Sequence, residues 1–119
     1  MDLDNAISVH VQWKSKLSAF IARPDNSLNA DSVAKDNQCE LGKWLYGEGR
    51  AHSKLPEFVK VVSDHQRFHR AAGEVIRKAQ SGESVTEDVA LGAKSEYSAS
   101  SNAVVGSLLS MKKKLCVRN

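Results

Sequence analysis

The sequence predicts an all-α protein, an antiparallel helical bundle of the four-helix type with a short inserted helix. Three observations support this fold. Apolar residues recur at steps of three and four along three long segments, Pro and Gly stand at the segment ends, and no stretch alternates as a strand would. The chain has 119 residues, which suits one domain with its own core. We therefore expect a single helical domain over residues 1–119.

The first long helix is expected over residues 2–22. One side of this segment is apolar at helical spacing and is interrupted only by His10. Pro24 ends the segment because its ring cannot continue a helix. The apolar positions are Leu3, Ile7, Trp13, Leu17, Phe20 and Ile21. His10 is therefore expected to face the core.

Two short helical pieces are expected next, a turn around residues 30–35 and a helix over 38–46. The surrounding stretch is rich in Asp, Asn and Ser, which favour turns and caps. Asn37 and Glu40 have the spacing of a capping pair. This interpretation places Cys39 in the first turn, where the helix dipole favours the thiolate.

A long helix is expected from Pro56, which suits the first helical position, to a stop at Gly82. His65 and His69 are consecutive members of its apolar face. That face consists of Leu55, Phe58, Val62, His65, His69, Ala72, Ile76 and Ala79.

The last helix is expected to begin at a capping box formed by Ser84 and Glu87 and to extend to Leu115. Its apolar residues are Val89, Ala93, Tyr97, Val104, Leu108, Met111 and Leu115. Small residues beside them are expected to allow close helix packing or to lie at a two-fold interface; they are Gly92, Ser95, Ala99, Ala103 and Gly106.

Four side chains are candidate metal ligands. His65 and His69 project from one helix face, so two imidazoles could bind one ion. His10 could join them from the first helix, and Cys39 could supply a thiolate from the short helix. Three imidazoles and one thiolate form a tetrahedral zinc shell, and this set suits zinc or cuprous copper better than magnesium or calcium. The structural alternative is a set of core histidines satisfied by hydrogen bonds.

Other residues of similar chemistry are expected to lie outside the site. His52 falls in a polar loop and is expected at the surface. Cys116 has no histidine neighbour and is interpreted as a bystander or a dimer-interface residue. Trp13 and Trp44 are expected in the core, where they could shield the site from solvent.

Charge and hydropathy exclude several classes of protein. The chain carries 17 basic and 14 acidic residues, a net charge of +3, which is too mild to indicate a nucleic-acid partner. No apolar run is long enough to span a membrane. The acidic N-terminus differs from a secretory signal, so we expect a cytoplasmic protein with reduced thiols.

Three segments together resemble the chemoreceptor zinc-binding domain family. Residues 39–47 have the sequence CELGKWLYG and are similar to the family's central motif. Residues 65–69, HQRFH, are similar to its His-x-x-Phe-His motif, and residues 10–14, HVQWK, to its first motif. The three motifs occur in the family's order, and the similarity spans essentially the whole chain.

The resemblance implies a zinc ion held by His10, Cys39, His65 and His69. It also implies a four-helix-type bundle, usually a homodimer, attached to chemoreceptors or diguanylate cyclases in bacterial cytoplasm. No such output domain is visible in this chain.

The predicted function is a regulatory sensor rather than an enzyme, because four protein ligands leave no open position on the metal. The trigger is either zinc availability or oxidation of Cys39, and the output is chemotaxis or cyclic-di-GMP signalling. The main alternative is a metal-free helical dimerisation module. A third is a hydrolase whose three-histidine zinc centre keeps an open water position, with Cys39 off the metal.

Overall fold

The computed structural model describes the whole chain except residues 1, 26, 83–85, 87–89 and 117–119. Within the described residues there are five α-helices and one 3-10 helix, and no strand. They are α1 (Leu3–Ala22), α2 (Ala30–Ala34), α3 (Glu40–Tyr46), η1 (Glu48–His52), α4 (Pro56–Gln80) and α6 (Glu96–Cys116). The all-α bundle predicted from the sequence is confirmed.

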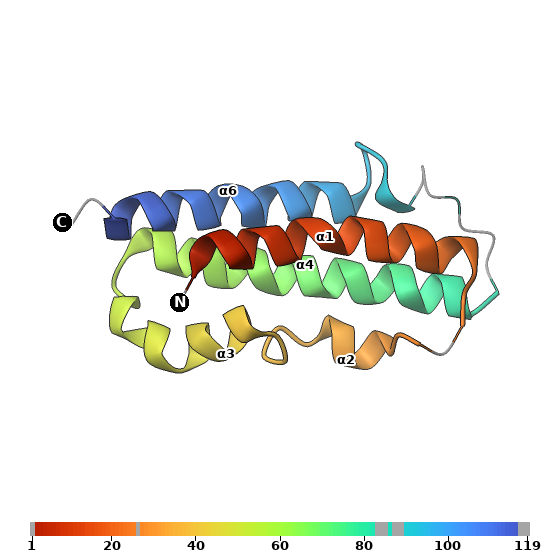
Figure 1. Ribbon diagram of the computed structural model, residues 1–119, viewed down its shortest axis with the longest axis horizontal. Coiled ribbons are helices and arrows are strands. Elements are labelled where there is room, and N and C mark those ends of the chain that lie inside the picture. The colour runs from red at the N-terminus through yellow and green to blue at the C-terminus, as the bar shows by residue number, and fades with distance from the viewer. Residues whose placement is uncertain (1, 26, 83–85, 87–89, 117–119) are drawn as a thin grey trace.

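The three long helices lie side by side, and the short elements α2 and α3 cover them along one flank (Figure 1). Helices α1 and α4 run in the same direction, whereas α6 and the α2–α3 segment run in the opposite direction. The second member of the four-part bundle is therefore a broken segment rather than a long helix. His10 of α1 and His65 of α4 thus meet across two parallel helices, because the returning α2–α3 segment brings the chain back to the same end before α4 begins.

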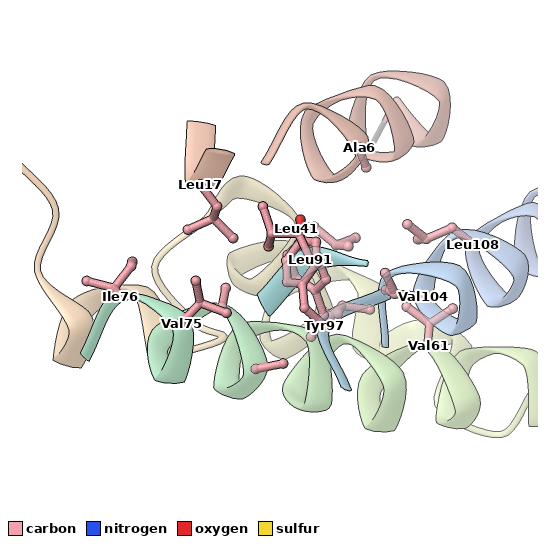
Figure 2. Packing of buried hydrophobic residues seen from close by; sticks show 14 of the residues in the cluster. Ala6, Leu17, Leu41, Val61, Val75, Ile76, Leu91, Tyr97, Val104 and Leu108 are labelled. Atoms are coloured by element: carbon pink, nitrogen blue, oxygen red, sulfur yellow. The ribbon is translucent and has the colours of Figure 1, made fainter. Parts of the chain in front are cut away.

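Buried apolar side chains of α1, α3, α4 and α6 meet in one core (Figure 2), and Ala30 and Val33 of α2 pack against it. Leu17 of α1, Leu41 of α3, Val61 of α4 and Leu108 of α6 are all almost fully buried. Burial of this kind contributes about 1.5–3 kcal/mol for each large aliphatic side chain. The core thus fixes the long helices that carry the histidines.

The α2 helix lies against α4 at a glycine. A Cβ atom added at Gly73 would lie 2.7 Å from the Cβ of Ala34. Only a residue without a side chain allows the two backbones to approach this closely. Gly73 therefore sets the position of the segment that leads to Cys39.

The last helix begins later than expected. Its first residue is Glu96, and residues 92–95 form a bend and turn rather than helix. Ser95 supplies the cap, because its Oγ accepts a hydrogen bond from the Ser98 N–H at 3.0 Å. The expected capping box of Ser84 and Glu87 lies outside the described residues.

Two of the small residues of α6 do not pack closely against the other helices. Ala99 and Gly106 face solvent, and a Cβ added at Gly106 would meet nothing within 4 Å. The small side chains that are buried belong to Ser100 and Ser107. None of the helices in the described ranges is both long and apolar enough to cross a membrane.

Candidate metal centre

Four side chains from three elements converge at one point. His10 comes from α1, Cys39 from the residue that precedes α3, and His65 and His69 from α4. One nitrogen or sulfur atom of each lies within 4.8 Å of the corresponding atoms of the other three. The three imidazoles are at most 4 % exposed, and Cys39 is half-buried. These are the four residues that the sequence analysis singled out.

The separations between these atoms match the edges of a small tetrahedron. His65 Nε2 lies 3.2 Å from His10 Nε2 and 3.0 Å from His69 Nε2. Cys39 Sγ lies 3.3 Å from His65 Nε2 and 3.6 Å from His69 Nε2. Zinc bonds of about 2.05 Å to nitrogen and 2.3 Å to sulfur imply tetrahedral edges of roughly 3.3 and 3.6 Å. Four of the six separations among the donors are thus close to those that one zinc ion requires, and the other two are no longer than 4.8 Å.

Two of the imidazoles are oriented by backbone carbonyls. His10 Nδ1 lies 2.7 Å from the Ala6 oxygen, and His69 Nδ1 lies 2.8 Å from the Val33 oxygen. A carbonyl oxygen can only accept, so each Nδ1 carries the proton and each Nε2 presents a lone pair to the cluster. Such contacts are the usual outer partners of metal-binding histidines.

His65 differs from the other two histidines. Its Nδ1 is buried and has no hydrogen-bond partner among the described residues. Its Nε2 lies between the bare Nε2 atoms of His10 and His69. Without a cation, a proton on His65 Nε2 can satisfy only one of these two acceptors. A metal ion would satisfy all three rings at once.

Cys39 is the N-cap of α3 rather than a residue of its first turn. Its Sγ accepts a hydrogen bond from the Gly42 N–H at 3.4 Å. The expected capping pair of Asn37 and Glu40 was therefore wrong, and the Asn37 Oδ1 instead accepts from the Gln38 side chain. The reason is that a sulfur acceptor already occupies the capping position.

The expected preference of Cys39 for the thiolate was also wrong in the absence of metal. Burial raises the pKa of the Cys39 thiol, and this outweighs the backbone N–H groups that favour the anion. Burial has the opposite effect on the pKa of the rings. It lowers the pKa of His10 and His69 and takes that of His65 to about 2. The histidines are therefore neutral, which is the form that binds a metal.

Close backbone packing fixes the approach of α3. A Cβ atom added at Gly42 would lie 1.7 Å from the Asp36 carbonyl oxygen. Gly42 is thus required where the chain preceding Cys39 folds over the start of α3.

A polar network ties the same segment to α4. The Tyr46 hydroxyl donates to the Asp36 carboxylate, and the Gln66 side-chain amide donates to the Tyr46 oxygen at 3.0 Å. The sequence analysis did not identify these three residues. They are distant in sequence, and no local pattern connects them, so no signal in one sequence could have found the network.

The remaining candidates lie away from the centre. His52 belongs to η1 and packs on Trp44, with ring centroids 5.9 Å apart. Trp44 also packs near Phe58 at 6.3 Å. Trp13 is partly buried against the core. Cys116 is the last residue of α6, and its side chain lies outside the described part of the chain.

Comparison with protein-family models identifies a family. A family model described as the chemoreceptor zinc-binding domain matches residues 10–76, more than half of the chain. The matched range begins at His10 and includes Cys39, His65 and His69. No curated protein and no solved structure matches the chain.

Proposed function

The chain belongs to the chemoreceptor zinc-binding domain family, and on this premise we propose that it is a zinc-binding regulatory domain of bacterial signalling. The proposed ligands are His10, Cys39, His65 and His69. The observation that carries the proposal is that their four donor atoms lie within 4.8 Å of one another in the core.

The donor set supports zinc. Imidazole nitrogen and thiolate sulfur are both donors that zinc takes in closed four-coordinate sites. Oxygen ligands, which magnesium and calcium need, are absent from the four-residue cluster. Bound zinc would act as a Lewis acid that holds four side chains of three elements together.

The four proposed ligands come from three elements of the fold, so the metal position is a junction between these elements. His10 belongs to α1, His65 and His69 to α4, and Cys39 to the start of α3. Loss of any one ligand would loosen the contact between α3 and the long helices. With four protein ligands there is no open position for a substrate or an activated water, so the proposal is a sensor and not an enzyme.

Two triggers are compatible with this junction. Zinc availability would change the order of the α2–α3 segment, because metal binding is coupled to local folding. Alternatively, a peroxide would transfer one oxygen to the Cys39 thiolate: an S–O bond forms, the O–O bond breaks, and hydroxide leaves. The sulfenate would be a poorer ligand. The oxidant version fails if Cys39→Ala retains the full oxidant response of the intact system.

The output and the oligomeric state are also proposals. From the family we propose a cytoplasmic partner of the chemoreceptor or diguanylate cyclase type, and a homodimer. The outward side of α6 supports a dimer face, because Gly106 leaves open space there and Leu109 is 51 % exposed. The rival is a helical dimerisation module that binds no metal.

Metal content separates the two functions. The protein would be purified without an affinity tag or chelator and analysed for metals, beside His65→Ala and the matched control His52→Ala. We expect about one zinc per chain in the parent and in the control, and a loss in His65→Ala. If the parent contains no stoichiometric metal, even after zinc is supplied, the zinc-binding function is wrong and the metal-free dimerisation module is favoured.

A further inference from the structure

A small cavity leads from the surface to the cluster. It has a volume of about 130 Å³ and lies between α1 and the start of α3. Asn5 and Val9 line it from α1, and His10, Cys39 and Glu40 also border it. It therefore opens onto two of the four converging side chains. A space of this size accommodates a molecule of several heavy atoms.

The chemistry of the cavity wall is selective. Most of its surface is carbon, and no Lys or Arg side chain lines it. The charged group that borders it is the exposed carboxylate of Glu40. The carboxylate of Asp36 also lies close enough to Cys39 to act on the thiol electrostatically. A negatively charged molecule entering here would pass the Glu40 carboxylate, with that of Asp36 nearby, and would meet no Lys or Arg side chain in the cavity wall.

We propose that this cavity is the route by which small, uncharged electrophiles and oxidants reach Cys39 Sγ, and that it disfavours anions. The inference rests on the proposed role of Cys39 as the reactive ligand of a regulatory site. It adds the class of reagent that the site admits. Reagents that enter the cavity reach the sulfur, because Cys39 is half-buried whereas the three imidazoles are almost fully buried.

Two alkylating reagents of similar size test the filter. Iodoacetamide is neutral and iodoacetate is an anion. With either one, Cys39 sulfur forms a bond to the CH₂ carbon, the C–I bond breaks, iodide leaves, and any thiol proton goes to water. The same sulfur attacks both reagents, so the fraction of thiolate cancels from the ratio of their rates.

The rates would be measured on the zinc-replete protein by site-resolved mass spectrometry, which separates Cys39 from Cys116. The reference is the ratio at Cys39 in the urea-unfolded chain. We expect folding to raise the ratio of the iodoacetamide rate to the iodoacetate rate by about threefold or more. Glu40→Gln should move the ratio back toward the reference. Equal ratios in the folded and unfolded chains would overturn the proposal.

A matched pair of variants tests the route itself. Val9 lines the cavity, whereas Val11 is 52 % exposed on the same helix and does not line it. Val9→Phe should slow alkylation of Cys39 by iodoacetamide severalfold, and Val11→Phe should leave the rate unchanged. Equal rates in the two variants would overturn the route. If Val9→Phe loses its helical circular dichroism, the ratio of the iodoacetamide rate to the iodoacetate rate in the parent still tests the proposal.

Failure of the proposed function has a separate signature. In that case the parent would contain no stoichiometric zinc, whatever the reagent ratio. If the parent binds zinc and the ratio is unaffected by folding, the sensor proposal stands and the cavity proposal is wrong.

Discussion

The Nδ1 of His69 lies 2.8 Å from the carbonyl oxygen of Val33, so that one ring on α4 contacts the backbone of α2 while its other nitrogen faces Cys39. The Cys39 Sγ is 3.6 Å from His69 Nε2. The imidazole therefore couples two points of the same returning segment to α4. Any ion held by these residues would stabilise the α2–α3 segment more than the long helices.

Hydrogen exchange tests this consequence. Removal of zinc from the protein should increase amide exchange mainly over residues 30–46, which contain α2, α3 and Cys39. The interior of α4 should change least, because its apolar face is buried in the core independently of the metal. The measurement is hydrogen–deuterium exchange with and without a chelator. Uniform deprotection of all helices would contradict the prediction.

Zinc binding should change the tautomer of one histidine. His10 and His69 already carry their proton on Nδ1, where a carbonyl accepts it. In the metal-free protein His65 Nε2 faces two bare nitrogens, so we expect it to carry a proton and donate it to one of them. Zinc requires that proton to move to Nδ1. We therefore expect a tautomer switch at His65 alone.

Long-range nitrogen–proton NMR spectra of the imidazoles check this directly. Spectra with and without zinc should show constant Nδ1–H forms for His10 and His69. His52, which lies outside the cluster, is the internal control. If the tautomer of His65 is the same with and without zinc, the assignment of its Nε2 as a ligand is contradicted.

Gly42→Ala should weaken both folding and zinc affinity. The new Cβ would lie 1.7 Å from the Asp36 carbonyl oxygen, so the start of α3 must shift together with the Cys39 cap. We expect a loss of about 2 kcal/mol in the free energy of unfolding and about tenfold or more in zinc affinity. Urea unfolding and competition with a chromophoric chelator measure the two effects.

Gly106→Ala is the matched control. It also lies inside a helix, but its Cβ would meet nothing within 4 Å. Helix propensity then predicts that the free energy of unfolding rises by about 0.5–1 kcal/mol, without a change in zinc affinity. If the two variants behaved alike, close packing at Gly42 would not explain its role.

Zinc binding should release about one proton per chain at neutral pH, because the ligand is a thiolate and the metal-free thiol is protonated. Burial raises the pKa of the Cys39 thiol, and the histidines stay neutral because burial lowers their pKa. The apparent affinity should therefore rise with pH up to the pKa of the thiol. Calorimetric titrations in buffers of different ionisation enthalpy count the protons.

The second cysteine provides the control for this count. Cys116→Ser should release the same number of protons as the parent, and Cys39→Ala should release almost none. Proton release that depends on Cys116 would contradict the assignment.

The sequence predicted the long helices and the pairing of His65 with His69 because both depend on local spacing, whereas the full set of four residues was implied by the resemblance to a family. A histidine in a stripe of apolar residues must face the core, and His65 and His69 share one face wherever their helix lies. The fold class followed from the same periodicity.

Features that depend on tertiary packing were predicted less well. The parallel direction of α1 and α4 follows from the returning α2–α3 segment, which the chain forms only when Gly73 and Gly42 allow close contact. Ser95 and Ser84 are equally good candidates for the N-cap, so the local sequence could not predict which of them begins α6. The pKa of Cys39 depends on burial, which opposes the effect of helix position.

The most direct test of the account is zinc K-edge X-ray absorption spectroscopy of the zinc-loaded protein. The account predicts a four-coordinate shell of three nitrogens at about 2.0–2.1 Å and one sulfur at about 2.3 Å, with the sulfur lost in Cys39→Ala. A shell of nitrogen and oxygen alone in the parent would contradict it. In that case Cys39 would not be a ligand, and the open fourth position would favour a hydrolytic centre over a sensor.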